Sequence, residues 1–327
     1  MPIVVNSNAS ATEASFNLSR NNEALRKSLG RLSSGKRISN PADDAGGLAV
    51  AYKLNSTINR SYATIQNAQN SLSYLQVQDS SLATVGKILD RMAELRTMAQ
   101  DITKNSGDIE NYSKEFIELQ SQLRQIKEEK FNGISLFSIS GSSTGSSKAQ
   151  LSTTSAGSYV DANGASHTYS KFGRELVTHP SGNTGNGSIS LNVVNLQFVL
   201  SLNGSSNANI NLGGIGNSSS GIASTQLGDD NFITKIRDIS VSEIINAIEK
   251  LADARAENGA EQNRIMNSIN LLQTNVTNLE AAHGRIMDAD IALESTRFAR
   301  YNVLVQASAA MTAQANQMTN IALSLLG

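Results

Sequence analysis

Near its C-terminus the chain repeats an apolar or small residue on a seven-residue pattern, and this seam most limits what the chain can fold into. The members of the seam are, in order, Leu304, Ser308, Met311, Ala315, Met318, Ala322 and Leu325. Such spacing lays small and medium side chains along one narrow stripe of a helix. A single helix with so thin a stripe buries too little area to be stable alone. The repeat therefore predicts that this helix associates with partner helices.

Composition points to an elongated structural protein rather than an enzyme. The 327 residues include no Trp, aromatic residues make up 5%, and hydrophobic residues make up only 39%, which is low for a compact globular core. Burial must therefore be spread along thin layers between helices.

The charge and the apolar runs argue against several partners and settings. A net charge of -1 gives no electrostatic footprint for nucleic acid or an anionic membrane. The sequence lacks a run of about 18 apolar residues, and its first residues lack a basic stretch, so we expect neither a membrane span nor a cleavable signal peptide. With no Cys, the chain has neither disulfides nor thiolate metal sites.

Charge divides the chain into helical flanks and a different centre. Between residues 138 and 228 the charged residues are only Lys148, Asp161, Lys171, Arg174 and Glu175. The centre is rich in Ser, Gly and Asn, which favours solvated loops that tolerate change. We therefore expect that residues 141–221 can be replaced by a short linker. Alternation through Leu196, Phe198, Leu200 and Leu202, followed by Asn203-Gly204, predicts a small β-hairpin or sheet there.

The N-terminal flank predicts three helices. Leu18, Leu25, Leu29 and Leu32 form the first seam, which stops at Gly35. Asp43 and Asp44 suit the start of a second helix, expected over residues 48–103, whose seam includes Leu95 and ends at Ile102. A break at 105–108 precedes a third helix with Phe116, Leu119, Leu123 and Ile126, which ends at the Asn132-Gly133 turn signal.

The C-terminal flank predicts a long helix opened by a capping box. Ser240 and Glu243 have the capping-box spacing, before apolar positions Ile245, Ile248 and Leu251. The seam continues through Ile265, Ile269, Leu272, Val276, Leu279 and Ile286. We interpret the seams of 48–130 and 240–283 as an intramolecular bundle. For residues 1–34 and 300–327, whose seams are thinnest, we expect neighbouring subunits to complete the packing.

Catalytic and metal-binding patterns are missing from the sequence. His167, His179 and His283 have no ligand spacing, and neither phosphate-loop nor nucleophile-elbow patterns occur. Asp288 and Asp290, like Asp43 and Asp44, are interpreted as caps and solvated charges, because near neighbours on a helix do not face one another. We therefore predict no enzymatic activity and no cofactor.

Both flanks carry motifs that resemble the bacterial flagellins. At the N-terminal end these are RLSSGKRI at 31–38, PADDAGGLA at 41–49 and FNG at 131–133. At the C-terminal end they are RIMDAD at 285–290, QANQ at 314–317 and LSLL at 323–326. The resemblance covers roughly residues 1–137 and 236–327 and omits the centre, which varies among flagellins.

The resemblance implies a mainly α fold, in which long antiparallel coiled-coil-like helices from both chain ends form a rod, with a small β-rich variable central insertion. The implied parts are a terminal helical domain (1–43 and 284–327), a rod domain (44–137 and 236–283), and a β-hairpin with a variable outer segment (138–235). The terminal domain of such proteins is disordered before assembly and lines the channel of the filament.

The function implied is self-assembly into the flagellar filament for swimming motility. The chain would be extracellular, after type III export without a cleavable signal peptide. Its partners would be further copies of itself, an export chaperone, the filament cap and hook-junction proteins. The expected inter-subunit residues are Leu18, Leu25, Leu29, Leu32, Leu304, Met311, Ala315, Met318, Ala322 and Leu325.

Two other functions are considered. A hook-filament junction protein shares flagellin-like terminal helices, although its signatures are usually more divergent than those here. A flagellin with an enzymatic central domain is disfavoured because HExxH is missing.

The resemblance also raises recognition by the vertebrate Toll-like flagellin receptor. The stretch LDRMAEL at 89–95 resembles the receptor-binding stretch and gives Arg91, Leu95 and Glu115 as contacts. Asp90 and Ala93 depart from the family pattern. In the alternative interpretation Leu95 continues the helical seam, and Arg91 and Glu115 are solvated charges.

Overall fold

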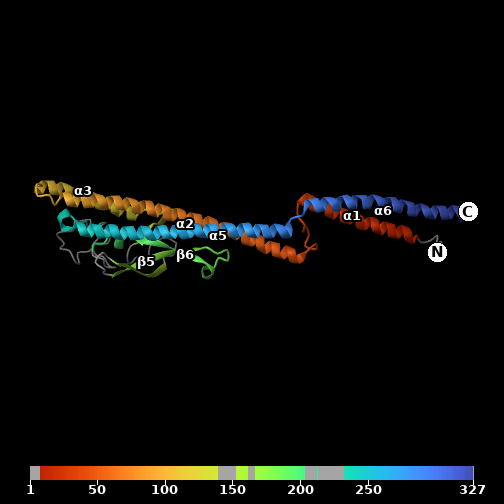
Figure 1. Ribbon diagram of the computed structural model, residues 1–327, viewed down its shortest axis with the longest axis horizontal. Helices are drawn as coiled ribbons and strands as arrows, with labels where there is room; N and C mark the ends of the chain where they lie inside the picture. The colour runs from red at the N-terminus through yellow and green to blue at the C-terminus, as the bar shows by residue number, and fades with distance from the viewer. Residues whose placement is uncertain (1–7, 139–151, 161–165, 203–211, 213–231, 327) are drawn as a thin grey trace. The chain divides into compact units, whose positions relative to one another are not determined.

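The computed structural model describes residues 8–138, 152–160, 166–202, 212 and 232–326 (Figure 1). It forms two compact units. The terminal unit comprises residues 1–59 and 274–327, and the central unit comprises residues 60–273. Two long helices, α2 (Ala45–Met98) and α5 (Val241–Met287), contribute residues to both units.

The terminal unit is built on an antiparallel pair of helices, α1 (Ala9–Ser34) and α6 (Ile291–Leu326). The side chain of Asn8 caps α1 by accepting from the amide of Ala11. Gly35 ends α1 in the left-handed region at φ 67°, which suits a residue without Cβ. The predicted stop of the first helix at this glycine is confirmed.

Helix α2 begins three residues before the expected residue 48, with Asp44 at its start as predicted, and it ends earlier than expected. Asp44 accepts from the amide of Gly47 at 2.8 Å and caps the helix. The helix ends at Met98 and is followed by turns, in which Gln100 donates to the carbonyl of Thr97 and Asp101 to that of Met98. The expectation that the seam continues to Ile102 is therefore wrong: Ile102 lies beyond the helix and is 98% exposed.

Helix α3 (Ser106–Lys127) opens with a capping box between Asn105 and Asp108. It ends four residues before Phe131, earlier than the sequence predicts, because the chain then enters a hairpin of β1 (Lys130–Phe131) and β2 (Ile134–Ser135). At the hairpin turn Asn132 has φ 50° and Gly133 has φ 78°, the two positive values that a type I′ turn requires. The Asn-Gly turn signal is confirmed.

In the central unit α5 runs antiparallel to α2. Arg255 pairs with Asp79, and Asn258 donates to the carbonyl of Leu75. The core between α2, α3 and α5 contains fully or nearly fully buried side chains, namely Leu75, Leu82, Val85, Leu89, Met92, Phe116, Leu123, Ile244, Ala247, Leu251 and Ile265. The capping box of Ser240 with Glu243 is present, but Ile244 rather than Ile245 faces the core, and Ile245 is 47% exposed.

A four-stranded sheet lies in the same unit, in the order β3-β6-β5-β4. The strands are β3 (Phe137–Ser138), β4 (Ser152–Val160), β5 (Ser166–Val177) and β6 (Ser188–Asn195). Strand β6 pairs antiparallel with β5 and parallel with β3. Short 3₁₀ turns lie at Thr184–Asn186 and Ile236–Asp238.

The strand predicted through Leu196 and Phe198 is a helix instead. Residues Leu196–Val199 form α4, whose N-terminus is capped by Asn195 through the amide of Phe198 at 3.2 Å. Leu196, Phe198, Val199 and Leu200 are all buried, so their apolar character reflects burial on several sides rather than alternation across a strand. Leu212 is also buried, whereas the Asn203-Gly204 signal lies outside the described residues.

A buried amide joins the sheet to the helices. Gln78 of α2, with no exposed surface, donates to the carbonyls of Leu136 (2.7 Å) and Asn192 (3.3 Å) and accepts from Asn258 of α5 at 2.7 Å. Because an unpaired buried amide is costly, this network fixes the position of the sheet on α2 and α5. The described part of the insertion is therefore integral to the central unit.

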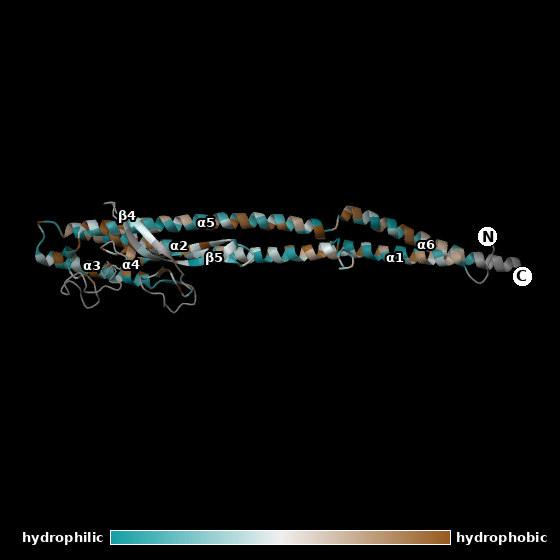
Figure 2. Ribbon diagram, turned by 90° about the horizontal axis from the view of Figure 1, so that it is seen from below, coloured by the Kyte–Doolittle hydropathy of each residue, from teal (hydrophilic) through white to brown (hydrophobic). Residues whose placement is uncertain are grey.

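Hydrophobic and hydrophilic residues are interspersed along the long helices (Figure 2). Among the described helices, none is both long enough and apolar enough to cross a membrane.

Candidate functional site

Polar side chains join α1 to α6 at several points along the pair. Asn21 donates to Ser308 at 2.8 Å, and Asn8 donates to the carbonyl of Ala315 at 2.8 Å. In α1 only Ser28 is buried. The contact between the two helices is thus thin, as the narrow seams predict, and it contributes little apolar burial to stability.

Large apolar side chains of the pair remain in solvent. Phe16 is 70% exposed, Leu29 53% and Met311 64%. Ile291, Leu293, Val303 and Leu304 are likewise exposed. A groove of about 330 Å³ between the helices is lined by Ala14, Ala307 and Met311 among others. Apolar surface gathered in this way on two helices is typical of a surface that other helices cover.

The predicted seam residues differ in how far the chain itself covers them. Leu18, Leu25 and Leu32 are partly buried, whereas Leu29 and Leu304 are exposed. Ala315 is only 8% exposed within one chain, so it leaves little surface for a neighbouring copy, and its inter-subunit role stays a prediction. Met318, Ala322 and Leu325 lie in α6, but their side chains lie outside the described part.

At one end of the pair, which we call its base, two connectors pair with each other. They are residues 35–44, between α1 and α2, and residues 288–290, between α5 and α6. Arg37 donates its amide to Met287 at 2.6 Å, and Ala289 donates to Gly35 at 2.9 Å, around an antiparallel bridge between Lys36 and Asp288. Arg37 also donates from Nε to the carbonyl of Ile286 at 3.1 Å. The motifs at 31–38 and 285–290 are therefore one structural feature, which the sequence alone did not reveal.

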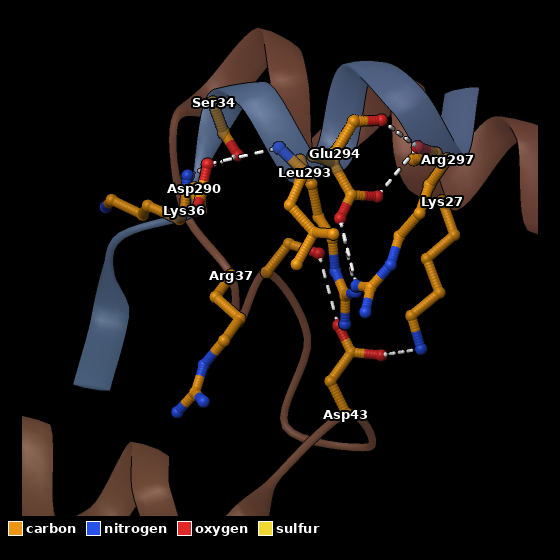
Figure 3. Close-up of polar contacts among 12 residues, drawn as sticks. Lys27, Ser34, Lys36, Arg37, Asp43, Asp290, Leu293, Glu294 and Arg297 are labelled. Atoms are coloured by element: carbon orange, nitrogen blue, oxygen red, sulfur yellow. Dashed lines mark hydrogen bonds and ion pairs between the residues drawn. The ribbon is translucent and has the colours of Figure 1, made fainter. Parts of the chain in front are cut away.

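Charged side chains reinforce this base (Figure 3). Glu294, 6% exposed, accepts from the hydroxyl of Ser28 at 2.7 Å and pairs with Arg297 at 3.3 Å and with Arg31 at 4.0 Å. Lys27 contacts Asp43 at 2.5 Å, and its ammonium group lowers the pKa of Asp43. Helix α1, helix α6 and the α1–α2 connector are thus tied together.

A small apolar cluster lies under the connectors. Ile38, Ala51 and Met287 are buried together, with Leu48 and Ile286 packed against them. Asp290 caps α6 by accepting from the amide of Leu293 at 3.1 Å, so the cap interpretation of this residue is confirmed.

The proposed receptor contacts lie in the central unit and do not form one surface. Arg91 donates to Glu115 at 2.8 Å and to Glu94 at 3.1 Å, and these carboxylates raise its pKa. Leu95, however, has 0% exposure. It belongs to the core between the helices and has no surface to offer a partner in this fold, so its assignment as a contact is corrected.

The described ranges were also searched for clusters of side chains that could bind a metal ion. Among the residues that the structure describes, no group of three or more His, Cys, Asp or Glu side chains could hold a metal ion. His179 hydrogen-bonds Ser181 at 2.8 Å in an exposed turn.

Comparison with known proteins gives one consistent result. Residues 5–144 match the model of the bacterial flagellin N-terminal helical region, and residues 241–326 match that of the C-terminal helical region. A flagellin of Clostridium tyrobutyricum is 29% identical over 97% of this chain and 100% of its own length. The flagellar filament 33 kDa core protein of Treponema phagedenis is 28% identical over 99% of this chain and 100% of its own length.

A crystal structure of Bacillus cereus flagellin aligns with 67% of this chain and 94% of that chain, at 20% identity and a TM-score of 0.38.

Proposed function

The chain belongs to the bacterial flagellins, structural subunits of the flagellar filament, and we propose that its α1–α6 pair is the surface that joins one copy to the next. The observation that carries this proposal is the thin, polar contact between α1 and α6, beside exposed Phe16, Leu29 and Met311. Packing of pairs from neighbouring copies buries these side chains and supplies the apolar burial that one chain lacks.

The proposed inter-subunit residues are the seam residues of α1 that the chain leaves exposed or only partly buried, together with residues of the C-terminal seam. They are Leu18, Leu25, Leu29, Leu32, Leu304, Met311, Met318, Ala322 and Leu325. In this proposal residues 1–43 and 284–327 act as one terminal domain that becomes fully packed only in the filament. Each copy contacts the next through two different faces. When the rotation from one copy to the next does not close into a ring, repetition of this contact generates an open helical polymer.

The further partners follow from the same helices. We propose that an export chaperone covers the C-terminal seam before assembly, and that the filament cap and the hook-junction proteins meet the two ends of the polymer. In the proposed pathway, type III export without a cleavable signal peptide delivers the chain to the extracellular filament. For the Toll-like receptor, the proposal now includes only Arg91 and Glu115, whose side chains are 44% and 43% exposed.

The test compares two exposed methionines. Met311→Asp places a charge in the proposed interface and should raise the critical concentration for assembly about tenfold or more, because burying a charge without a partner is costly. Met266→Asp, in α5 of the central unit, is the matched control, since Met266 is 42% exposed and lies outside the proposed interface. Sedimentation and electron microscopy measure assembly. Equal assembly of Met311→Asp and wild type would overturn the proposed surface.

A further inference from the structure

One carboxylate of α5 contacts two side chains of the sheet. Glu257 accepts from Nζ of Lys171 in β5 through Oε1 at 2.7 Å, and from Nδ2 of Asn192 in β6 through Oε2 at 2.7 Å. An amine and a carboxamide are therefore held on the two oxygens of a single carboxylate. A carboxylate in this position can take a proton from the amine and deliver one to the amide nitrogen, because both nitrogens lie at hydrogen-bond distance.

The register of the sheet lets these two side chains of β5 and β6 reach each other. Asn192 lies opposite Gly173, and Lys171 is two residues from Gly173 along β5. Lys171 and Asn192 are therefore diagonal neighbours on one face of the sheet. Gly173 has no side chain, which leaves the space between them open. The Lys171 side chain is long, flexible and 26% exposed, so its amine can move from the carboxylate to the amide carbon of Asn192.

Asn192 is fixed in place and shielded from water. Its backbone amide donates to the carboxylate of Glu261 at 2.9 and 3.1 Å, and its carbonyl accepts from Gln78 at 3.3 Å. The residue is 7% exposed, so bulk water competes poorly with a neighbouring amine for the amide carbon. A cavity of about 10 Å³, roughly the space of one water molecule, is lined by Asn192, Glu257 and Tyr169 and has room for a released ammonia.

We propose that Lys171 and Asn192 join in an isopeptide bond and that Glu257 catalyses the reaction. Glu257 takes one proton from the Lys171 ammonium group, and the neutral Nζ attacks Cγ of Asn192. Glu257 then delivers that proton to Nδ2, and the bond between Cγ and Nδ2 breaks with its electron pair on nitrogen. The carboxylate accepts the second proton that Nζ loses and passes it to the ammonia, which departs as ammonium. Glu257 is regenerated, and no oxidant or cofactor takes part.

The reaction is a single event within one folded chain. Holding the amine and the amide on one carboxylate replaces an encounter in solution by a local movement, which is a large kinetic advantage. The product ties two neighbouring strands together covalently in a chain that contains no Cys. All three residues belong to the central unit, so the bond does not depend on the proposed filament function.

Peptide mass spectrometry of folded, dispersed subunits tests the bond. Wild type should yield a branched peptide that joins the segments around Lys171 and Asn192 and weighs one ammonia less than the two separate peptides. Lys171→Arg keeps a positive charge beside Glu257 but lacks the nucleophilic amine, so it should yield two separate peptides. Lys171→Arg should also unfold at a lower urea concentration than wild type, because a covalent link constrains the unfolded chain.

Glu257→Gln tests the proton carrier. Glutamine keeps the size of the side chain but cannot shuttle protons at neutral pH, so the branched peptide should form about 100-fold more slowly or less. The matched control is Glu249→Gln, because Glu249 also lies on α5 and accepts from Tyr159 of the sheet at 3.1 Å. It should form the bond as wild type does, and circular dichroism verifies that each variant is folded.

Two results would overturn the proposal. Separate peptides from folded wild type after prolonged incubation, with Asn192 recovered as asparagine or as aspartate, would show that the bond does not form. Equal rates of bond formation in folded Glu257→Gln and wild type would show that Glu257 is not the catalyst. The peptide map of wild type decides the first point even where a variant fails to fold.

Discussion

At the residue scale, Glu261 links the pH to the stability of the central unit. Its two carboxylate oxygens accept from the amide of Asn192 in β6 at 2.9 and 3.1 Å. One turn earlier on α5, Glu257 accepts from the side chains of Asn192 and Lys171, each at 2.7 Å. Burial raises the pKa of Glu261 from 4.5 to about 7, because desolvation opposes its charged form more than Asn192 and Lys171 favour it.

A raised carboxyl pKa means that the folded state binds the proton more tightly than the unfolded state. The resulting stabilisation is complete below pH 4.5 and is lost as the pH rises through about 7. Between pH 5 and pH 8 we expect the central unit to lose about 2 kcal/mol through this group. Urea denaturation at both pH values should show a smaller loss in Glu261→Gln than in wild type. The exposed control Glu118→Gln should behave as wild type, and an unchanged loss in Glu261→Gln would refute this assignment.

Leu95 and Arg91 illustrate a limit of motif matching at single residues. Both lie in the stretch that resembles a receptor-binding motif, yet Leu95 is fully buried and Arg91 is half exposed. We expect Leu95→Ala to destabilise the central unit by about 3 kcal/mol, the usual cost of truncating a buried leucine. Arg91→Ala should leave the urea midpoint nearly unchanged, because exposed ion pairs contribute little. Similar midpoints for the two variants would contradict the burial of Leu95.

At the scale of elements, sequence predicted helix starts better than helix ends. Caps are local, so Asp44 and Ser240 identify their helices without reference to the rest of the fold, whereas the capping box at Asn105 was interpreted as part of a break. The end of α2 at Met98 and the short helix α4 depend on what packs around them. Alternation alone could not separate a strand from a helix buried on several sides at Leu196–Val199.

The joint between α1 and α6 gives a prediction for this pair of elements. Glu294→Ala leaves Ser28 and Arg31 without their shared carboxylate, and hydrogen bonds to charged groups contribute about 2 kcal/mol. We expect the terminal unit of Glu294→Ala to melt at a lower temperature than that of wild type, as measured by circular dichroism. The control is Glu23→Ala, because Glu23 is an exposed residue of α1. A melting temperature equal to that of wild type would show that the carboxylate does not hold the joint.

At the scale of the whole molecule, the sequence identified the family and both helical ends, but it did not show how closely the centre packs against the helices. The small sheet expected in the centre is present, and replacement of residues 141–221 by a linker stays a prediction; the structure adds that such a replacement removes buried Phe172, Leu191 and Val193 and the bond from Gln78 to Asn192. Composition did not reveal this, because the sheet takes its apolar cover from distant helices. Composition also did not reveal the pairing of the connectors, because it joins residues far apart in the sequence. The hydrogen bond from Arg37 to Ile286, for example, joins residues 249 positions apart.

The central claim is that the α1–α6 pair is completed by other copies, whereas the central unit is complete in one chain. Hydrogen–deuterium exchange, compared between dispersed subunits and filaments, tests this claim most directly. The account predicts that amides of α1 and α6 exchange about 100-fold more slowly in filaments, while amides beside Leu75 and Leu89 are protected equally in both. Equal protection of α1 and α6 in subunits and filaments would contradict it.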